Sequence, residues 1–173
     1  MIGSWEMDRL CESRQLFEFS RAYLKSSISL CPRIQRLRRM PRYPEATVLL
    51  FLARHAVELF LKGAIIARSP NAKLDHDLER LKSMYDKLYT EQMFSWVLPF
   101  TTEYPGMTSA QILVAKKHIP PGEQVYRYPI DRAGAKWNGI FALEPLTFQR
   151  DMRAIGKEMA RLAQRILAAN KAP

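Results

Sequence analysis

Apolar residues recur every three or four positions along most of this chain, and this spacing predicts amphipathic helices. The clearest helix is predicted at about 147–169, where one face is apolar: Phe148, Met152, Ile155, Met159, Leu162 and Ile166. The opposite face is cationic: Arg150, Arg153, Lys157, Arg161 and Arg165. One face is therefore expected to pack in a core and the other to be solvated.

Breaks in the same pattern divide the rest of the chain. Further helices are predicted at about 4–30, 44–67, 75–89, 91–100 and 110–118. Pro32 and Pro99 are expected to end two of these helices, because proline lacks the N–H that a helix interior needs. Pro44 suits a first helical turn, and Asp75 suits an N-cap.

Residues 124–142 differ from the helical segments. The stretches QVYRYPID and KWNGIFAL flank Arg-Ala-Gly-Ala, which predicts a small hairpin or an extended insert. With this insert set aside, the pattern predicts a single all-α domain over residues 1–173, built as a bundle of four or five helices.

The helix predicted at 44–67 is apolar nearly all round, which is typical of a helix at the centre of a bundle. Arg54, His55, Glu58 and Lys62 interrupt it and share one quarter of its circumference. Buried charges need partners, so we expect Glu58 to be buried and to neutralise its three neighbours. An ion-pair stripe of this kind can set helix register without doing any chemistry.

Charge narrows the class of partner. Lys and Arg outnumber Asp and Glu by 27 to 17, which gives a net charge of +10 and a pI of about 9.9. This balance favours polyanions such as RNA, DNA or acidic membrane surfaces. The densest run of cations contains no acid: Arg33, Arg36, Arg38, Arg39 and Arg42. We interpret this run as a basic connector that could hold phosphates.

Other classes of protein are disfavoured. The longest largely apolar run, 46–53, is far shorter than a membrane span, and no signal-peptide pattern opens the sequence, so we expect a soluble, cytoplasmic protein. The two cysteines predict reduced thiols rather than a disulfide scaffold. We expect no metal and no cofactor, because the chain has no Gly-rich phosphate loop and only one His-x-x-Glu, in the reverse of the order that di-metal bundles use.

Three segments in order carry a resemblance to a known family. RHAVELFLKGAI is followed by LDHDLERL and then by YRYPID. In these segments the chain resembles the HEPN (higher eukaryotes and prokaryotes nucleotide-binding) superfamily, closely over about 44–90 and loosely over 124–131. The resemblance implies an up-and-down bundle of four or five helices, usually dimeric. Many members are metal-independent RNases of toxin–antitoxin or phage-defence systems, and others are inactive binding modules.

The RNase members carry an arginine, four to six residues and then a histidine, and this spacing is absent here. The chain has His55, His76 and His118, and none follows an arginine at that distance. A looser arrangement stays open, because an arginine stabilises phosphate charge and a histidine transfers the proton of a 2′-hydroxyl. Arg54, His55 and His76 are the candidates for catalysis. His76 could instead simply hydrogen-bond to Glu58.

The remaining candidates are binding residues. Glu58, Lys62 and Asp77 belong to the two helical segments of the resemblance, while Arg127 and Tyr128 combine charge with a stacking surface, as binders of single-stranded RNA do. The expected partners are a second copy of the chain, RNA or a nucleotide, and an antitoxin or nucleotidyltransferase. The alternative function is a non-catalytic protein-interaction module in which the polar stripe is structural.

Overall fold

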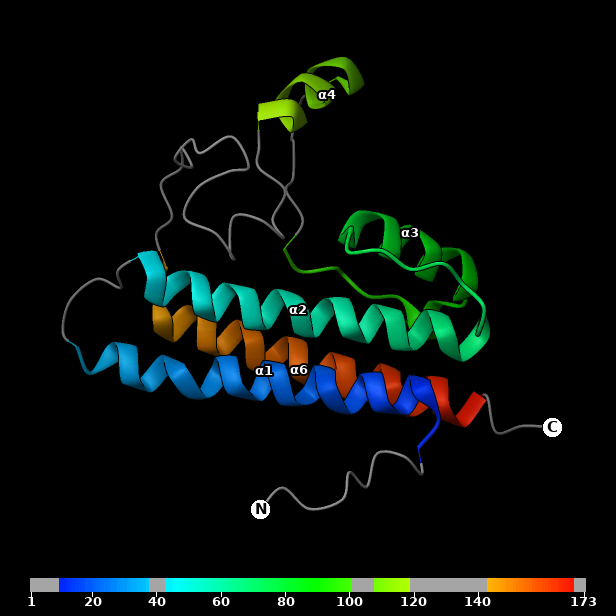
Figure 1. Cartoon of the computed structure of the whole chain (residues 1–173), viewed down its shortest axis with the longest axis horizontal. Helices are drawn as coiled ribbons and strands as arrows, with labels where there is room; N and C mark the ends of the chain where they lie inside the picture. Colours follow the sequence, from blue (N-terminus) through cyan, green and yellow to red (C-terminus); the bar gives the residue numbers. More distant parts are fainter. Residues whose placement is uncertain (1–9, 38–42, 101–107, 119–142, 170–173) are drawn as a thin grey trace.

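The computed structural model describes residues 10–37, 43–100, 108–118 and 143–169, and within these ranges it contains helices and no strand (Figure 1). The elements are α1 Glu12–Gln35, α2 Tyr43–Arg68, α3 Leu78–Leu88, the 3₁₀ turn η2 Gln92–Phe94, α4 Ser109–His118 and α6 Pro145–Ala169. The predicted all-α bundle is confirmed. The insert predicted at 124–142 lies outside the described residues.

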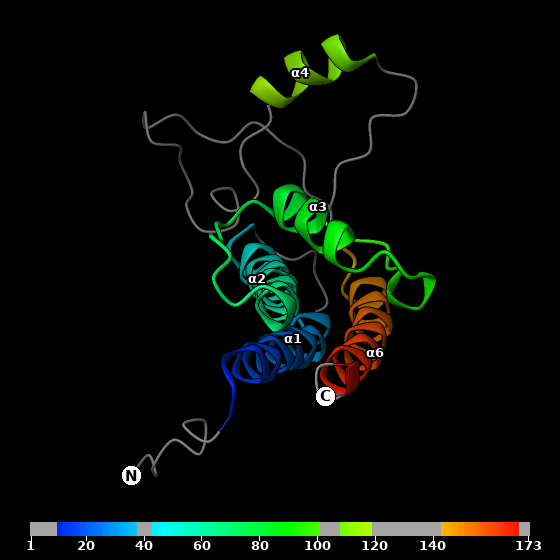
Figure 2. The ribbon, with the colours of Figure 1, turned by 90° about the vertical axis from the view of Figure 1, so that its right-hand side faces the viewer.

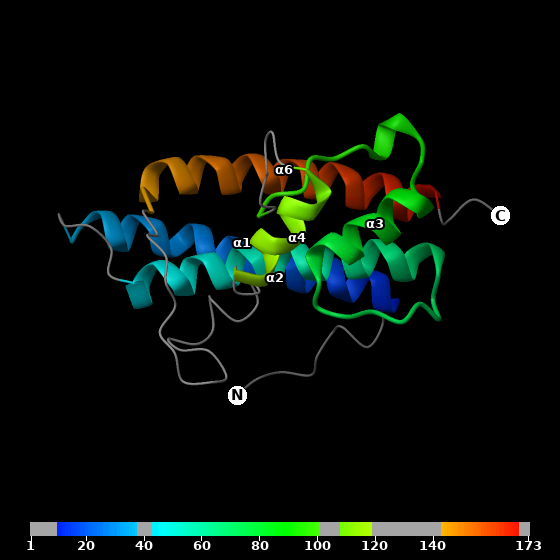
Figure 3. The ribbon, with the colours of Figure 1, turned by 90° about the horizontal axis from the view of Figure 1, so that it is seen from above.

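Three long helices, α1, α2 and α6, lie side by side and form the body of the protein (Figures 1 and 3). α2 packs against α1, α3 and α6, as expected for its nearly continuous apolar surface. Figure 2 shows α3 covering α2 on the side away from α1, and α4 lying apart from the packed helices. Within the described ranges, no helix combines the length and apolarity needed to cross a membrane.

The direction of α3 departs from the up-and-down order that the resemblance implies. His76, just before α3, lies beside Glu58 in the middle of α2. The carbonyl of Leu88, at the end of α3, accepts a hydrogen bond from Arg68 at the end of α2. α3 therefore runs parallel to α2. Figure 1 shows that α6 runs in this direction too, whereas α1 runs the opposite way.

Buried serines hold α1 and α2 close together. Ser13, Ser20 and Ser27 follow one another at intervals of seven along α1, and each is buried. Ser20 donates to the carbonyl of Ala56 at 2.6 Å, and Ser27 donates to that of Leu49 at 2.9 Å. At the next step, a Cβ added to Gly63 would lie 3.0 Å from the carbonyl oxygen of Ser13. Small residues thus set an antiparallel register with a period of seven.

The prediction that Pro32 ends the first helix is wrong, because α1 continues through it to Gln35. Proline has no N–H to donate to the carbonyl four residues earlier, which belongs to Ile28. Gln149 of α6 replaces the missing donor, with its Nε2 3.3 Å from the Ile28 oxygen. A side chain more than a hundred residues away therefore compensates for proline inside the helix.

Two predicted helix starts are also displaced. α1 begins at Glu12 rather than near residue 4, since residues 10 and 11 are not helical. α3 is capped by Asp77 rather than Asp75. The Asp77 carboxylate accepts hydrogen bonds from the N–H groups of Glu79 and Arg80, whereas Asp75 accepts from the N–H of Asp77.

The helix predicted at 91–100 is wrong apart from the single turn η2. Phe94, Trp96 and Leu98 are buried while Ser95 and Val97 between them are exposed. This alternation with a period of two is typical of extended chain, whose successive side chains point in opposite directions. The segment, residues 91–100, packs across the bundle as a strap.

Hydrogen bonds hold the strap in place. The Tyr85 hydroxyl donates to the carbonyl of Phe94, and both Arg161 and Arg165 donate to that of Met93. These two arginines were expected on the solvated face of the last helix. Arg165 is exposed as predicted, as are Arg150, Arg153 and Lys157, whereas Arg161 is half-buried. Arg161 and Arg165 also fasten the strap to α6.

Replacing Gln149 by leucine should destabilise the protein by about 1–3 kcal/mol, the cost of leaving a part-buried carbonyl without a donor. Replacing Pro32 by alanine should remove most of this cost, because the alanine would supply its own N–H to the carbonyl of Ile28. Urea unfolding of wild type, P32A, Q149L and the double variant measures the coupling. Equal costs of Q149L in the two backgrounds would contradict the compensation between α1 and α6.

Candidate functional site around Glu58

Helix α2 brings four ionisable side chains onto one stripe, as its sequence predicts. Arg54, Glu58 and Lys62 follow one another at intervals of four, which places them on the same helix face, and His55 lies beside them. Glu58 is buried, with an exposed fraction of 3%. The predicted burial of this carboxylate is confirmed.

Each oxygen of the Glu58 carboxylate faces one cationic side chain and one histidine. Oε1 lies 2.7 Å from Nζ of Lys62 and 2.8 Å from Nδ1 of His76. Oε2 lies 3.8 Å from the Arg54 guanidinium and 3.7 Å from Nδ1 of His55, which is longer than a hydrogen bond. One buried carboxylate thus joins the α2 stripe to His76, at the segment that leads into α3.

The neighbours of Glu58 determine its charge. Burial by itself raises the pKa of a carboxyl group, since it penalises the charged form. The interactions with His55, Lys62 and His76 outweigh burial and lower the pKa of Glu58 from its ordinary value of 4.5 to about 2. The group is therefore ionised throughout the neutral range and acts as an acceptor for the surrounding donors.

His76 is the most exposed member of the cluster. Its side chain is 66% exposed, whereas those of Arg54 and Lys62 are only 12% and 14% exposed. The contact to Glu58 engages Nδ1, so Nε2 is the ring nitrogen left for other partners. Arg54 also donates to the backbone carbonyl of His76 at 3.3 Å, which holds the residue from a second side.

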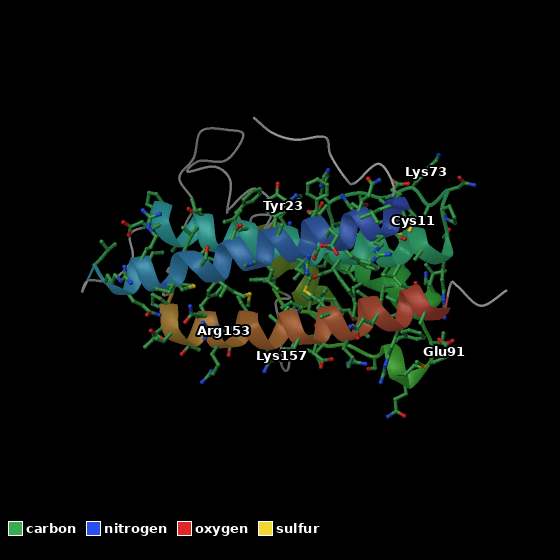
Figure 4. The ribbon with its side chains drawn as sticks, turned by 90° about the horizontal axis from the view of Figure 1, so that it is seen from below. Cys11, Tyr23, Lys73, Glu91, Arg153 and Lys157 are labelled. Carbon is green, nitrogen blue, oxygen red and sulfur yellow. The ribbon has the colours of Figure 1, made fainter. Side chains whose placement is uncertain are left out.

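Aromatic rings hold His55 in place, a feature that the sequence analysis missed. Its imidazole meets the ring of Tyr23 edge-on at 4.7 Å and stacks on Phe51 at 5.7 Å between ring centroids. Figure 4 shows Tyr23 on the side of α1 that faces away from α6. Phe51 precedes His55 by four residues, a signal that the sequence contains, but the contact from α1 needs the fold.

The other predicted residues do not join this cluster. Asp77 caps α3. Arg33 lies in the last turn of α1 and Arg36 is its C-cap residue, both exposed. They lie at the end of the bundle where α2 begins, and Glu58 is fifteen residues further along that helix, about 22 Å at 1.5 Å per residue. The remaining candidates lie outside the described residues: Arg38, Arg39, Arg42, Arg127 and Tyr128.

In the described part of the chain, no three His, Cys, Asp or Glu side chains are grouped so that they could hold a metal ion. Comparisons of the chain with models of protein families, with curated proteins and with solved structures found no match. The arrangement of the residues themselves therefore carries the functional argument.

Replacing Glu58 by glutamine should destabilise the protein by about 3–5 kcal/mol at pH 7, because buried cations lose their counter-charge. The lowered pKa means that Glu58 contributes its full stability above about pH 4.5 and loses it as the pH falls toward about 2. The difference between wild type and E58Q in urea unfolding should therefore shrink between pH 5 and pH 3, a range that brackets the upper part of this transition.

The matched control is Glu18→Gln, which removes a carboxylate from the exposed ion pair with Arg21 on α1. Exposed pairs contribute about 0–1 kcal/mol, so this variant should unfold almost like wild type. A cost for E58Q as small as that of E18Q, or one that does not change with pH, would contradict the buried network.

Proposed function

We propose that the protein is an HEPN-like helical domain that binds RNA in a bacterial toxin–antitoxin or defence setting. One support is the contact between two of the segments that carry the resemblance. RHAVELFLKGAI supplies Glu58 and LDHDLERL supplies His76, and these two side chains lie 2.8 Å apart. The all-α architecture is compatible with this family, and the parallel course of α3 is a departure from it.

The observation that carries RNA binding is a row of exposed cations that runs from the end of α1 to the middle of α6. Gln149 reaches Ile28, which brings the start of α6 beside the last turns of α1. Arg33 and Arg36 are exposed at the end of α1, and Arg153 and Lys157 are exposed along the first half of α6. None of the four has an acidic partner within the described ranges. Figure 4 shows Arg153 and Lys157 along α6. Such cations are available for phosphate oxygens.

The cluster at Glu58 is less suited to gripping a backbone of phosphates. Arg54 and Lys62 are mostly buried, and Glu58 already neutralises part of their charge. Removing them from this carboxylate would leave a buried charge unpaired. The exposed cations therefore bind the polyanion, and the buried network at Glu58 holds α2 to α3.

The proposal extends to assembly and setting. The protein acts in the cytoplasm as a homodimer, with an antitoxin or nucleotidyltransferase as a further partner. The dimer and the further partner follow from the family resemblance, and size measurement by sedimentation of the purified chain tests the dimer directly.

RNA binding should weaken steeply with salt, because each phosphate contact on a single strand releases about 0.7 of a counterion. The double variant R36Q/R153Q removes two of the exposed cations that have no acidic partner in the described structure. It should lower the slope of log affinity against log salt by about 1.4 without unfolding the protein. Gel-shift assays on mixed-sequence RNA at several salt concentrations give both slopes.

The control is K73Q/K87Q, which removes the same charge from exposed lysines elsewhere. It should leave the slope within experimental error of wild type. If both double variants lower the salt slope equally, net charge alone attracts RNA. If wild type does not bind RNA even at low salt, the protein-interaction module remains as the function.

A second candidate function, metal-independent RNA cleavage, is favoured by the geometry of His76. A buried carboxylate on Nδ1 fixes the tautomer and orientation of an imidazole and leaves Nε2 free to transfer a proton. The ring of His76 is exposed enough for a substrate to reach it. His55 and Arg54 lie at the same carboxylate, so the three predicted catalytic residues are brought together.

If the dyad of Glu58 and His76 transfers protons, His76→Ala should abolish RNA cleavage. The gel-shift affinity for RNA should stay within about twofold of wild type, because phosphate attraction does not need the imidazole. Cleavage should persist in EDTA. The variant His55→Ala removes the ring held between Tyr23 and Phe51 and tests separately whether the second predicted catalytic histidine is needed for cleavage. Cleavage by H76A at the wild-type rate would exclude the dyad as its source.

A further inference from the structure

A groove runs along the surface between α1 and α6, on the side shown in Figure 4. It encloses about 490 Å³ and extends from Arg14 to Ile28 on α1 and from Gly156 to Leu167 on α6. At the end nearest Arg14 it continues into a second hollow bounded by Cys11, Ile66 and Ala168. Fourteen residues separate Arg14 from Ile28, which at 1.5 Å per residue is about 21 Å of groove.

The floor of the groove is apolar. Phe17 and Leu24 of α1, Phe60 of α2 and Met159 of α6 line it. On the α6 side the wall is built of small residues, Gly156, Ala160 and Ala163, so another backbone can come close. The groove is therefore open, long and apolar along its base.

The rim of the groove on α1 is cationic. Arg14, Arg21 and Lys25 lie along it at intervals of seven and four, which places them on one side of the helix. Glu18 is the one acid lining the groove in the described structure, and it pairs with Arg21. Arg14 and Lys25 have no acidic partner in this part of the chain.

We propose that this groove docks an amphipathic helix of a partner protein, about four turns long, with an apolar stripe and acidic flanks. The length of the groove matches such a helix, and its base receives side chains spaced three and four apart. The row of cations on α1 pairs with acids that recur along the partner. With the helix in place, α1, α2, α6 and the partner form a four-helix bundle.

Two other occupants fit the groove less well. A single-chain lipid would need most of its surface enclosed and one cationic end for its head group, whereas this groove is open and its cations recur along its length. A second copy of the chain carries a net charge of +10, and this charge would be repelled by the cationic rim. A partner of opposite charge satisfies both the shape and the rim.

The test uses two synthetic peptides of about 18 residues, long enough to fill the groove as a helix. Both have the same leucine and alanine stripe, with glutamate on the flanks of one and lysine on the flanks of the other. Fluorescence anisotropy with the full-length protein should show saturable binding of the glutamate peptide that weakens with salt. The lysine peptide should bind at least about tenfold more weakly.

Two pairs of variants locate the binding. Ala160→Glu places a carboxylate in the groove, and Ala154→Glu places one at another exposed position of the same helix. Lys25→Glu reverses a rim charge, and Lys73→Glu reverses an exposed charge elsewhere. A160E and K25E should each weaken the glutamate peptide at least about tenfold, with A154E and K73E within about twofold of wild type. Circular dichroism checks that all four variants are folded.

Several outcomes would overturn the proposal. Equal affinity of A160E and A154E would place the peptide elsewhere on the protein. Binding of dodecyl phosphate that A160E blocks, with no binding of either peptide, would make the groove a lipid site. A wild-type dimer that A160E alone dissociates would make it an interface between two copies. None of these outcomes depends on RNA, so the proposed RNA binding stands or fails separately.

Discussion

The arrangement of α2 and α3 depends on a single buried charge. Glu58 lies in the middle of the central helix, and interactions with His55, Lys62 and His76 hold its carboxylate ionised. A buried carboxylate without these partners would cost several kcal/mol. The chain that leads into α3 returns to the middle of α2 and supplies His76 as one of the partners. α3 therefore starts beside Glu58 and runs parallel to the second half of α2.

Polar groups also determine how closely the long helices approach. The serines of α1 are short enough to let α2 come near, and their hydroxyls find acceptors in its carbonyls. Gln149 acts in the same way between α6 and α1, where it supplies the hydrogen bond that Pro32 cannot make. Each of these polar groups finds its hydrogen-bond partner on the facing helix. A shift of one helix along the other would leave the group buried without a partner, so these hydrogen bonds fix the register.

The positive charge of the chain is divided between two roles. Arg54 and Lys62 are committed to Glu58, and Arg161 and Arg165 to the strap at Met93. Arg153 and Lys157 on α6, and Arg14 and Lys25 on the groove rim, have no such internal task within the described ranges. Net charge alone does not distinguish these groups, whereas burial and contacts do. The outward cations supply the surface for which we propose anionic partners.

Much of the fold follows from the sequence alone. The helices at α2 and α6 were predicted to within a few residues, because an apolar face with a 3.6-residue period depends only on local spacing. The stripe from Arg54 to Lys62 follows from the same periodicity, as does the need of Glu58 for partners. The alternation of Phe94, Trp96 and Leu98 is also present in the sequence, although the helix predicted at 91–100 does not take it into account.

Contacts between segments that are distant in the sequence decided the features that local spacing cannot predict. Pro32 stops a helix unless a donor arrives from elsewhere, and the donor is on α6. Serine is polar in any local pattern, and only a facing carbonyl on α2 makes its burial favourable. That His76 rather than Asp77 faces Glu58, and that α3 runs parallel to α2, depends on which distant groups satisfy a buried charge. Periodicity specifies which residues share a face, but hydrogen bonds and charges between segments specify what that face meets.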